Sequence, residues 1–439
     1  MIRGCDVLIL GAGVAGLSTA IDLSRAGLRV EIIEGRERVG GRILTQFDAI
    51  LNHSVELGAE FVHGLAPEIW LPVQEHDLGV TEVDGDFWCS TNGKLEPCRF
   101  FREVEKILSK MDDRSPDQSF LEFLVQKFPG NDHDEAKQHA IAYVSGFNAA
   151  DPAQVSVQWL VHGRAAEEEI QGDRAFHISG GYQTFLDLLT DDLASRQVPI
   201  HLNTKVQRVR WNTGQVEIGV VSGKSEATFS GPCAVITFPL GVLQSAAQEA
   251  GINFDPQLPA EKLRALEKLA MGKVVRVTLC FRRRIWEDIT AQEKTLAGMS
   301  FLFSDDKLFP TWWTQMPDPV PMITGWAPAA SAENLRGMSE GRIVQKAIET
   351  LSRLLGLKPS VQSELVGAYF HDWDLDPFSQ GAYSYVKAGG EGCQRTLGAP
   401  VDSTLFFAGE ATDVSGHNGT VHGAIASGKR AAQEILALR

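Results

Sequence analysis

The hydrophobic and polar positions near the start of the chain follow a pattern typical of a strand, a tight turn and a helix. An apolar run at residues 5–10 (CDVLIL) predicts a buried strand, residues 11–16 predict a turn, and residues 17–26 repeat with a helical period. A second apolar run, RVEIIE at 29–34, follows directly. This order predicts one β-α-β unit.

Further along, the pattern divides the chain into longer segments. Residues 65–175 are mostly polar and predict an inserted helical region, with amphipathic stretches at 101–111, 119–128 and 134–147. Short apolar runs predict that strands return within 177–240. Residues 241–370 alternate between the two types, with predicted helices at 260–270 and 339–355 and strands at 274–281 and 321–327. The chain ends on a predicted strand at 405–409 and a helix at 420–437.

Composition narrows the classes of function. The 439 residues carry a formal net charge of −15, which argues against binding to nucleic acid or to an anionic membrane. The apolar run at 7–10 is too short for a signal-peptide core or a membrane span, so we expect a cytoplasmic protein without a transmembrane segment. The 6 cysteines show neither a CxxC pair nor metal-type spacing, which predicts reduced thiols and no metal site.

A glycine-rich turn carries the first chemical signal. Gly11, Gly13, Ala15 and Gly16 lie between the first strand and its helix, where small residues let a pyrophosphate approach the backbone amides at the positive helix end. Glu34 ends the second strand, where its carboxylate would accept hydrogen bonds from ribose hydroxyls and repel a 2′-phosphate. The unit therefore predicts binding of FAD or NAD and not of NADP.

The segment 34–42 (EGRERVGGR) resembles the FAD-dependent amine oxidase family, which includes monoamine, polyamine and spermine oxidases and flavin histone demethylases. The resemblance identifies the dinucleotide as FAD. It implies that Gly40 and Gly41 let the backbone approach the pyrophosphate, that Arg42 pairs with it, and that Arg36 lies near the adenine ribose.

The resemblance continues in the segment 56–64 (ELGAEFVHG), which is similar to the family segment that runs under the flavin. It implies that His63 faces the substrate, although a structural role for this histidine stays open. It also implies that the backbone of Val206 reads the adenine. By the same resemblance, Gly58, Ala59, Glu60 and Phe61 are expected to contact the cofactor.

The segment 271–279 departs from the family at one position. It resembles the strand whose lysine holds a water near the flavin and assists the reaction with oxygen, but that position is occupied by Arg276. Lys273 lies three residues away, on the opposite face of a regular strand. Arginine keeps the positive charge but cannot act as a base, so the identity of the electron acceptor stays open.

Residues 373–384 and the position of His417 resemble family regions that enclose the flavin. In residues 373–384, the resemblance implies that Trp373 contacts the cofactor and that Tyr383 forms one wall of an aromatic cage around the substrate nitrogen. Ala382 stands where monoamine oxidases carry the cysteine that is joined to the flavin, which implies noncovalent FAD. His417 occupies the position of the second cage wall, which is usually a tyrosine.

The last family signal is residues 406–412 (FFAGEAT) followed by 418–424 (NGTVHGA). By resemblance, Gly409 and Glu410 contact the ribityl chain, and a helix beginning near Thr420 and Val421 directs its amino end at the flavin ring. Reduction of a flavin places negative charge there, which the positive end of a helix stabilises.

Two further groups of side chains fall in the predicted substrate domain, and each has two interpretations. Trp312 and Trp313 could line an apolar pocket, but core packing is favoured. The acidic run Glu167, Glu168 and Glu169 is favoured as a solvated helix face, with a funnel for polycations as the alternative.

We therefore expect the α/β and α+β architecture of flavin amine oxidases, with two domains. A discontinuous Rossmann-like FAD-binding domain would comprise residues 1–75, 177–240 and 372–439, and a substrate domain of mixed sheet and helices would comprise 76–176 and 241–371.

The resemblance implies that a small-molecule amine is oxidised through an imine to an aldehyde by hydride-equivalent transfer to FAD, with molecular oxygen reduced to hydrogen peroxide. A polyamine is the favoured substrate and a primary monoamine the next. The alternatives are an L-amino-acid oxidase with Arg276 as the carboxylate clamp, a dehydrogenase or desaturase with another electron acceptor, and a non-catalytic flavin-binding scaffold.

Overall fold

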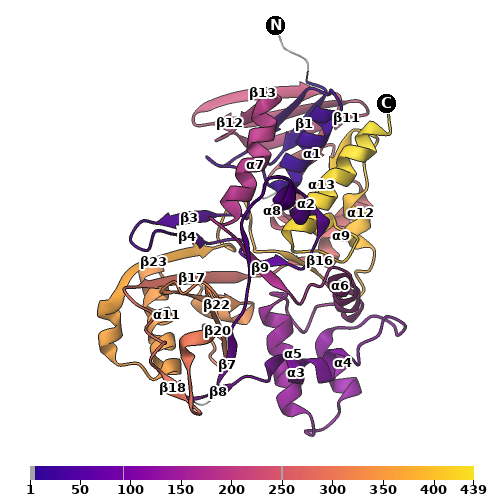
Figure 1. Ribbon diagram of the computed structural model, residues 1–439. Coiled ribbons are helices and arrows are strands. Elements are labelled where there is room, and N and C mark those ends of the chain that lie inside the picture. Colours follow the sequence, from indigo (N-terminus) through magenta and orange to yellow (C-terminus); the bar gives the residue numbers. More distant parts are fainter. Residues whose placement is uncertain (1–4, 92, 249–250) are drawn as a thin grey trace.

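The computed structural model describes residues 5–91, 93–248 and 251–439 of the chain. A five-stranded parallel sheet forms the centre of one half of the molecule. The predicted β-α-β unit is present within it (Figure 1). The strand order is β10-β2-β1-β14-β25, with bounds β1 Val7–Leu10, β2 Val30–Ile33, β10 Ile200–His201, β14 Ala234–Ile236 and β25 Leu405–Phe407. Every neighbouring pair is parallel.

Both faces of this sheet are covered, which explains why its strands are apolar without alternation. Val7 and Ile9 point to one face, where they pack against helices, whereas Leu8 and Leu10 point to the other face, against a second sheet. The helices are α1 (Val14–Arg25), α2 (Pro67–Glu75), α7 (Tyr182–Ser195) and α13 (Val421–Leu436). The second sheet contains β11 (Lys205–Asn212), β12 (Gln215–Ser222), β13 (Ser225–Gly231) and β15 (Asn253–Asp255).

Helices α1 and α13 lie side by side although their sequences are about four hundred residues apart (Figure 1). Thr19 Oγ1 donates a hydrogen bond to the Gly428 carbonyl at 3.0 Å. A Cβ atom at Gly428 would lie 2.3 Å from the Ala15 carbonyl oxygen, so only glycine permits this approach. The contact brings the amino ends of the two helices to the same region of the molecule.

The other half is built on a seven-stranded mixed sheet of order β23-β17-β22-β21-β20-β7-β8, at the lower left of Figure 1. Helices α10 (Ala330–Leu335) and α11 (Glu340–Leu355) pack against it. The strands are β7 (Asp86–Thr91), β8 (Lys94–Pro97), β17 (Val274–Phe281), β20 (Met299–Ser304), β21 (Thr311–Thr314), β22 (Met322–Pro328) and β23 (Leu365–Asp372).

The prediction of a helical region at 65–175 is only partly right. Its three amphipathic stretches are helices, α3 (Phe100–Leu108), α4 (Phe120–Lys127) and α5 (Asp134–Gly146), followed by α6 (Val157–Glu169). However, β7 and β8 also lie within it and belong to the large sheet. The region also contains β6 (Val80–Glu82) of a separate small sheet, whose other strands are β5 (Val62–His63), just before the region, and β9 (Ala175–Ile178), which begins at its last residue. These strands are short and partly exposed, so tertiary pairing rather than an apolar pattern defines them. Helix α7 was likewise missed within 177–240.

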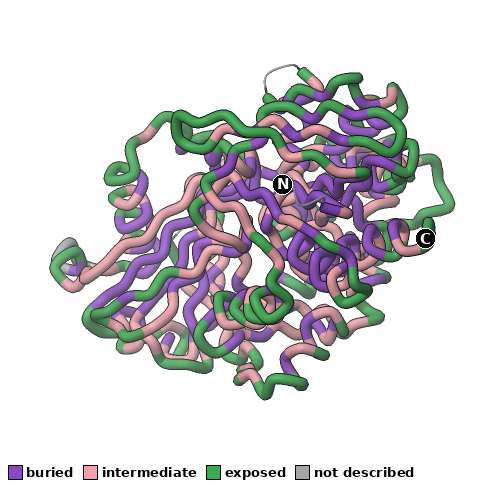
Figure 2. Tube along the Cα trace, turned by 90° about the horizontal axis from the view of Figure 1, so that it is seen from above, coloured by how far each residue is buried: buried purple, intermediate pink, exposed green. Residues whose placement is uncertain are grey.

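The remaining elements belong to none of the sheets described so far. They are β3 (Thr45–Asp48), β4 (His53–Glu56), β16 (Leu269–Met271), β18 (Thr290–Ala291), β19 (Lys294–Thr295), β24 (Ser384–Val386), α8 (Leu240–Ala247), α9 (Ala260–Lys268) and α12 (Cys393–Gly398), with 3-10 turns at Leu296–Gly298, Pro359–Glu364 and Glu410–Thr412. Figure 2 shows the buried segments gathered in the interior, with exposed segments around them. None of the described helices is long and apolar enough to cross a membrane. The predicted domain boundaries stay a prediction.

The prediction that all six cysteines are reduced thiols is wrong for one pair. Cys89 and Cys98 form a disulfide with a Cα–Cα distance of 4.9 Å. The cause is the β7–β8 hairpin, whose register places Cys89 opposite Glu96 and brings the Cys98 amide to the Phe87 carbonyl at 2.9 Å. The other cysteines are free thiols: Cys5, Cys233, Cys280 and Cys393.

Candidate active site

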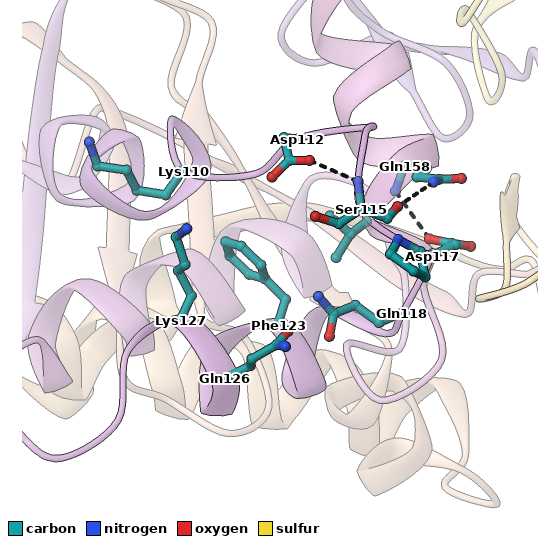
Figure 3. A pocket seen from close by; sticks show the side chains of 11 residues that line it. Lys110, Asp112, Ser115, Asp117, Gln118, Phe123, Gln126, Lys127 and Gln158 are labelled. Atoms are coloured by element: carbon teal, nitrogen blue, oxygen red, sulfur yellow. Dashed lines mark hydrogen bonds between the residues drawn. The ribbon is translucent and has the colours of Figure 1, made fainter.

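A cavity of about 1620 Å³ lies at the carboxyl ends of the parallel strands. Gly11 follows β1, Glu34 follows β2, Thr237 follows β14 and Gly409 lies just beyond β25, and all four line the cavity. Open parallel sheets bind ligands at this edge. A smaller hollow of about 270 Å³ lies near the end of α3, lined by polar residues such as Lys110 (Figure 3). The predicted site residues, except Gly16, line the larger cavity.

The glycine turn leaves the amino end of α1 open to the cavity. A Cβ atom at Gly16 would lie 2.1 Å from the Gly11 carbonyl oxygen, so the tight turn requires glycine there. Gly13 is the residue before the helix, and a Cβ built on it meets no heavy atom within 4 Å. Gly40 and Gly41 border the same space. Free space in front of unpaired helical amides fits a pyrophosphate group.

Glu34 lies at the end of β2 beside this turn, as predicted for a ribose contact. Its carboxylate accepts hydrogen bonds from the amides of Ala12 and Arg36, each at 2.8 Å. The guanidinium of Arg36 is bound by Asp376 at 2.8 Å and lies over the Phe378 ring. Arg36 thus lines the predicted adenosine side of the cavity while it is held by an ion pair within the protein.

Arg42 and Glu410, which were predicted to contact different parts of FAD, pair with each other. Arg42 Nη1 lies 2.7 Å from Glu410 Oε1 and donates a second hydrogen bond to the Ala382 carbonyl at 2.8 Å. The other oxygen of Glu410 accepts from Ser384 Oγ at 2.6 Å and from the Gly419 amide at 3.0 Å. Glu410 therefore joins its own loop to two segments that are distant in sequence, at Arg42 and at Ser384, in the wall of the cavity.

Helix α13 directs its amino end into the same cavity. The Thr420 hydroxyl accepts a hydrogen bond from the Gly423 amide at 3.0 Å, and Val421 is the first helical residue. The first turn contains no acidic side chain, so its positive end is not neutralised there. Thr420 and Val421 both line the cavity, which fits a group that becomes negatively charged.

Arg276 lies in β17 and is almost fully buried, with 2% of its surface exposed. Its guanidinium forms an ion pair with Glu60, donates to the Gly58 carbonyl at 3.1 Å and lies over the Trp313 ring. Glu60 also accepts hydrogen bonds from Trp313 Nε1 and from the Gln315 side chain, each at 2.9 Å. The positive charge of Arg276 is therefore matched inside the protein.

The pKa of Glu60 reflects this environment. Burial is the largest single influence and raises the pKa, but the charges of Arg276 and His177 and the hydrogen bonds from Gln315 and Trp313 together hold the pKa of Glu60 below its usual range. Among the described residues, Arg276 Nε has no hydrogen-bond partner, although it is buried. Lys273 pairs with Glu333 in a partly exposed position, as strand alternation predicts.

Tyr383 and three histidines line the part of the cavity nearest α13. The Tyr383 hydroxyl donates to the Phe147 carbonyl at 2.7 Å, and the His63 ring packs edge-on against Phe147 at 5.4 Å. Burial lowers the pKa of His63 to about 4, so its imidazole is neutral at neutral pH. The rings of His417 and His422 lie 4.7 Å apart, and burial with the nearby imidazoles lowers the pKa of His422 to about 3. His422 was not predicted as a site residue.

The structure brings nearly all the predicted site residues together. Gly16 packs beneath the glycine turn, and the other predicted residues line one cavity. Those not yet placed are Ala15, Ala59, Phe61, Val206 and Trp373.

Neither the tryptophan pair nor the acidic run behaves as a unit, because the members of each group have different environments. Trp312 belongs to the core, whereas Trp313 lines the cavity. Glu167 is partly buried in the cavity wall, Glu168 lines the cavity but is exposed, and Glu169 is exposed outside it, so a purely solvated face does not describe Glu167. Burial raises the pKa of Glu167 to about 7.

Comparisons with known proteins find relatives over the whole chain. The family model described as flavin containing amine oxidoreductase matches residues 14–436. Polyamine oxidase 2 of Arabidopsis thaliana is 30% identical, over 98% of this chain and 88% of that protein. Lysine-specific histone demethylase 1 homolog 2 of Oryza sativa subsp. japonica is 28% identical over 98% of this chain, and the chain spans 57% of its length. The solved structure of a putrescine oxidase bound to putrescine has a TM-score of 0.81 at 21% identity and 99% coverage of both chains, which shows a common fold.

Proposed function

Because the chain belongs to the flavin-containing amine oxidoreductase family, we propose that it oxidises a diamine or polyamine with noncovalently bound FAD. The carbon beside the amine nitrogen gives up a hydride equivalent and the nitrogen a proton, so that the bond between them becomes the double bond of an imine. Water hydrolyses the imine to an aldehyde and either ammonia or a shortened amine. Molecular oxygen is the final electron acceptor and is reduced to hydrogen peroxide.

The cavity fits FAD in three respects. The open amino end of α1 suits the pyrophosphate, Glu34 suits a ribose, and the amino end of α13 suits a ring that gains negative charge. Bound FAD supplies the two-electron acceptor for the hydrogen on the carbon beside the amine nitrogen. Ala382 lines the cavity and has no nucleophilic atom, which supports noncovalent binding.

The environment of Glu167 is the observation that supports a diamine or polyamine as the substrate. Its side chain has no hydrogen-bond or ion-pair partner among the described residues, yet it lies in the cavity wall and burial raises its pKa to about 7. A second ammonium group of the substrate would supply the missing partner and stabilise the carboxylate. Glu105 and Glu168 line the same side of the cavity, with Glu105 paired to Arg164 at 3.0 Å.

The groups around the reacting end favour a neutral amine. His63 and His422 have lowered pKa values and are uncharged at neutral pH, and Tyr383 holds its hydroxyl toward the protein backbone. Tyr383 thus presents its ring to the cavity, where an aromatic face orients a nitrogen. His417 forms part of the same wall, in the proposed position of the second cage residue.

Comparison of a diamine with a monoamine of equal length tests the role of Glu167. In Glu167→Gln we expect kcat/KM for putrescine to fall at least about tenfold, equivalent to loss of roughly 1.4 kcal/mol, while kcat/KM for butylamine stays unchanged. Glu169→Gln is the matched control, because Glu169 is an exposed carboxylate two residues away on α6. Equal losses for the two substrates would overturn this assignment.

A dehydrogenase that passes electrons to an acceptor other than oxygen is the second candidate, and Arg276 favours it. The guanidinium is committed to Glu60 and Gly58 and lacks the mobility of a lysine ammonium. Hydrogen peroxide formed per amine oxidised distinguishes the two: one equivalent supports the oxidase, and almost none supports the dehydrogenase. In the second case Arg276→Lys is expected to increase the rate of flavin reoxidation by oxygen.

The ion pair of Arg276 also bears on amino-acid oxidation. A clamp for a substrate carboxylate needs an unmatched positive charge, but Glu60 already matches that of Arg276 in a buried site. This arrangement supports an amine without a carboxylate as the substrate.

A further inference from the structure

A continuous set of aromatic side chains lines one side of the cavity. We call it the aromatic wall; its members are Trp313, Phe61, Phe301, Phe303, Phe87 and Phe101, all of which line the cavity. They come from separate parts of the sequence that meet where β7 pairs with β20 and where α3 follows the β7–β8 hairpin.

The ring contacts are unbroken from the interior to the surface. Trp313 contacts Phe61 at 5.7 Å between ring centroids, and Phe61 contacts Phe301 at 6.0 Å. Phe301 contacts Phe87 at 5.6 Å, and Phe87 contacts Phe101 at 5.5 Å. Trp313 is 6% exposed at the inner end, whereas Phe87 and Phe101 are 40% and 46% exposed at the outer end.

The outer end has an apolar surface that nothing in the described structure covers fully. On helix α3 the exposed member is Phe101; Val104 and Leu108, on the same face of the helix, also line the cavity but are 3% and 5% exposed. Binding of an apolar group against exposed phenylalanines at the opening of a ligand cavity is favourable, because it removes apolar surface from water. The inner end of the wall begins at Arg276 and Glu60, so the surface belongs to the same cavity as the proposed reacting centre.

We propose that the aromatic wall binds an apolar arm of the substrate. The substrate class is an amine that carries an alkyl or aryl group extending from the reacting nitrogen toward Phe87 and Phe101. This inference rests on the proposed function for the place of the nitrogen. It adds that the affinity for the amine increases with the length of its alkyl or aryl arm along the aromatic wall. This contribution is separate from that of the cationic group beside Glu167.

Alkyltrimethylammonium ions test the proposal without turnover, because a quaternary nitrogen cannot form a neutral imine. Calorimetric titration of the FAD-loaded protein with the butyl, hexyl and octyl compounds should show binding that tightens by up to about fourfold per methylene group. Affinity independent of chain length in the unaltered protein would overturn the proposal.

Three variants locate the effect. Phe87→Ala and Phe101→Ala should reduce the gain between hexyl and octyl at least about threefold and leave affinity for tetramethylammonium unchanged. Phe47→Ala is the matched control, because Phe47 lies in β3, is 64% exposed and is not a cavity residue. If the two wall variants keep the full chain-length dependence but change the sedimentation coefficient, the surface serves association with another molecule and the proposal is wrong.

The outcome is separable from that of the proposed function. If polyamines reduce the flavin but chain length has no effect on binding, only the aromatic-wall inference fails. If chain length matters and no amine reduces the flavin, the inference of an apolar subsite stands and the proposed reaction fails.

Discussion

The buried ion pair between Arg276 and Glu60 makes a quantitative prediction about stability. The two side chains are 2% and 3% exposed, so neither charge has water to replace a lost partner. Removing one member of such a pair costs about 3–5 kcal/mol, because it leaves an uncompensated buried charge. We therefore expect Glu60→Gln and Arg276→Met each to lower the free energy of unfolding by roughly that amount.

The double variant is the decisive one. With both charges removed, no buried ion is left unpaired, so Glu60→Gln with Arg276→Met should be less destabilised than the sum of the single variants by at least about 2 kcal/mol. Urea unfolding at neutral pH, followed by tryptophan fluorescence, measures all four proteins. Additive single effects, or single effects below about 1 kcal/mol, would refute the argument that the two charges balance each other.

Two further predictions concern Glu56 and the cofactor. Burial raises the pKa of Glu56 to about 8, so its protonated form stabilises the fold at low pH and this stability is lost as pH rises from about 4.5 through 8. Glu56→Gln, which keeps an acceptor for the Tyr182 amide, should abolish this fall, which is on the order of 3–5 kcal/mol in the unaltered protein; an unchanged pH profile of urea unfolding would contradict it. Because Ala382 provides no atom for a covalent bond, acid precipitation should leave all the flavin in the supernatant, and a yellow pellet would show that another residue is attached to it.

Sequence patterns predict well the parts of the fold whose structure depends only on residues close together in the chain. The run VLIL of β1 and the strand at 274–281 are buried along their whole length, and the second is apolar except for Arg276 and Thr278. The glycine turn needs only neighbouring residues. Strands β7 and β8 are different, because β7 pairs with β20, about two hundred residues away, and β8 joins the sheet through β7. No local pattern contains that information.

The same distinction applies to the site. Glu34, Arg42 and Glu410 were found because they lie in recognisable motifs, but the pairing of Arg42 with Glu410 needs the folded chain. Glu167 was read as one of three adjacent acids, and only packing separates it from Glu169. The disulfide between Cys89 and Cys98 was missed for this reason too, since it depends on hairpin register rather than on a spacing motif.

The most direct test of the account is anaerobic titration of the oxidised, FAD-loaded protein with putrescine, spermidine, spermine, phenylethylamine and a set of L-amino acids. Loss of the visible absorbance of oxidised flavin reports electron transfer from each compound without any dependence on oxygen. The account predicts that the diamine and polyamines bleach the flavin at lower concentration than phenylethylamine does, because only they provide a second cation for Glu167. Bleaching by amino acids alone, or by none of these compounds, would contradict it.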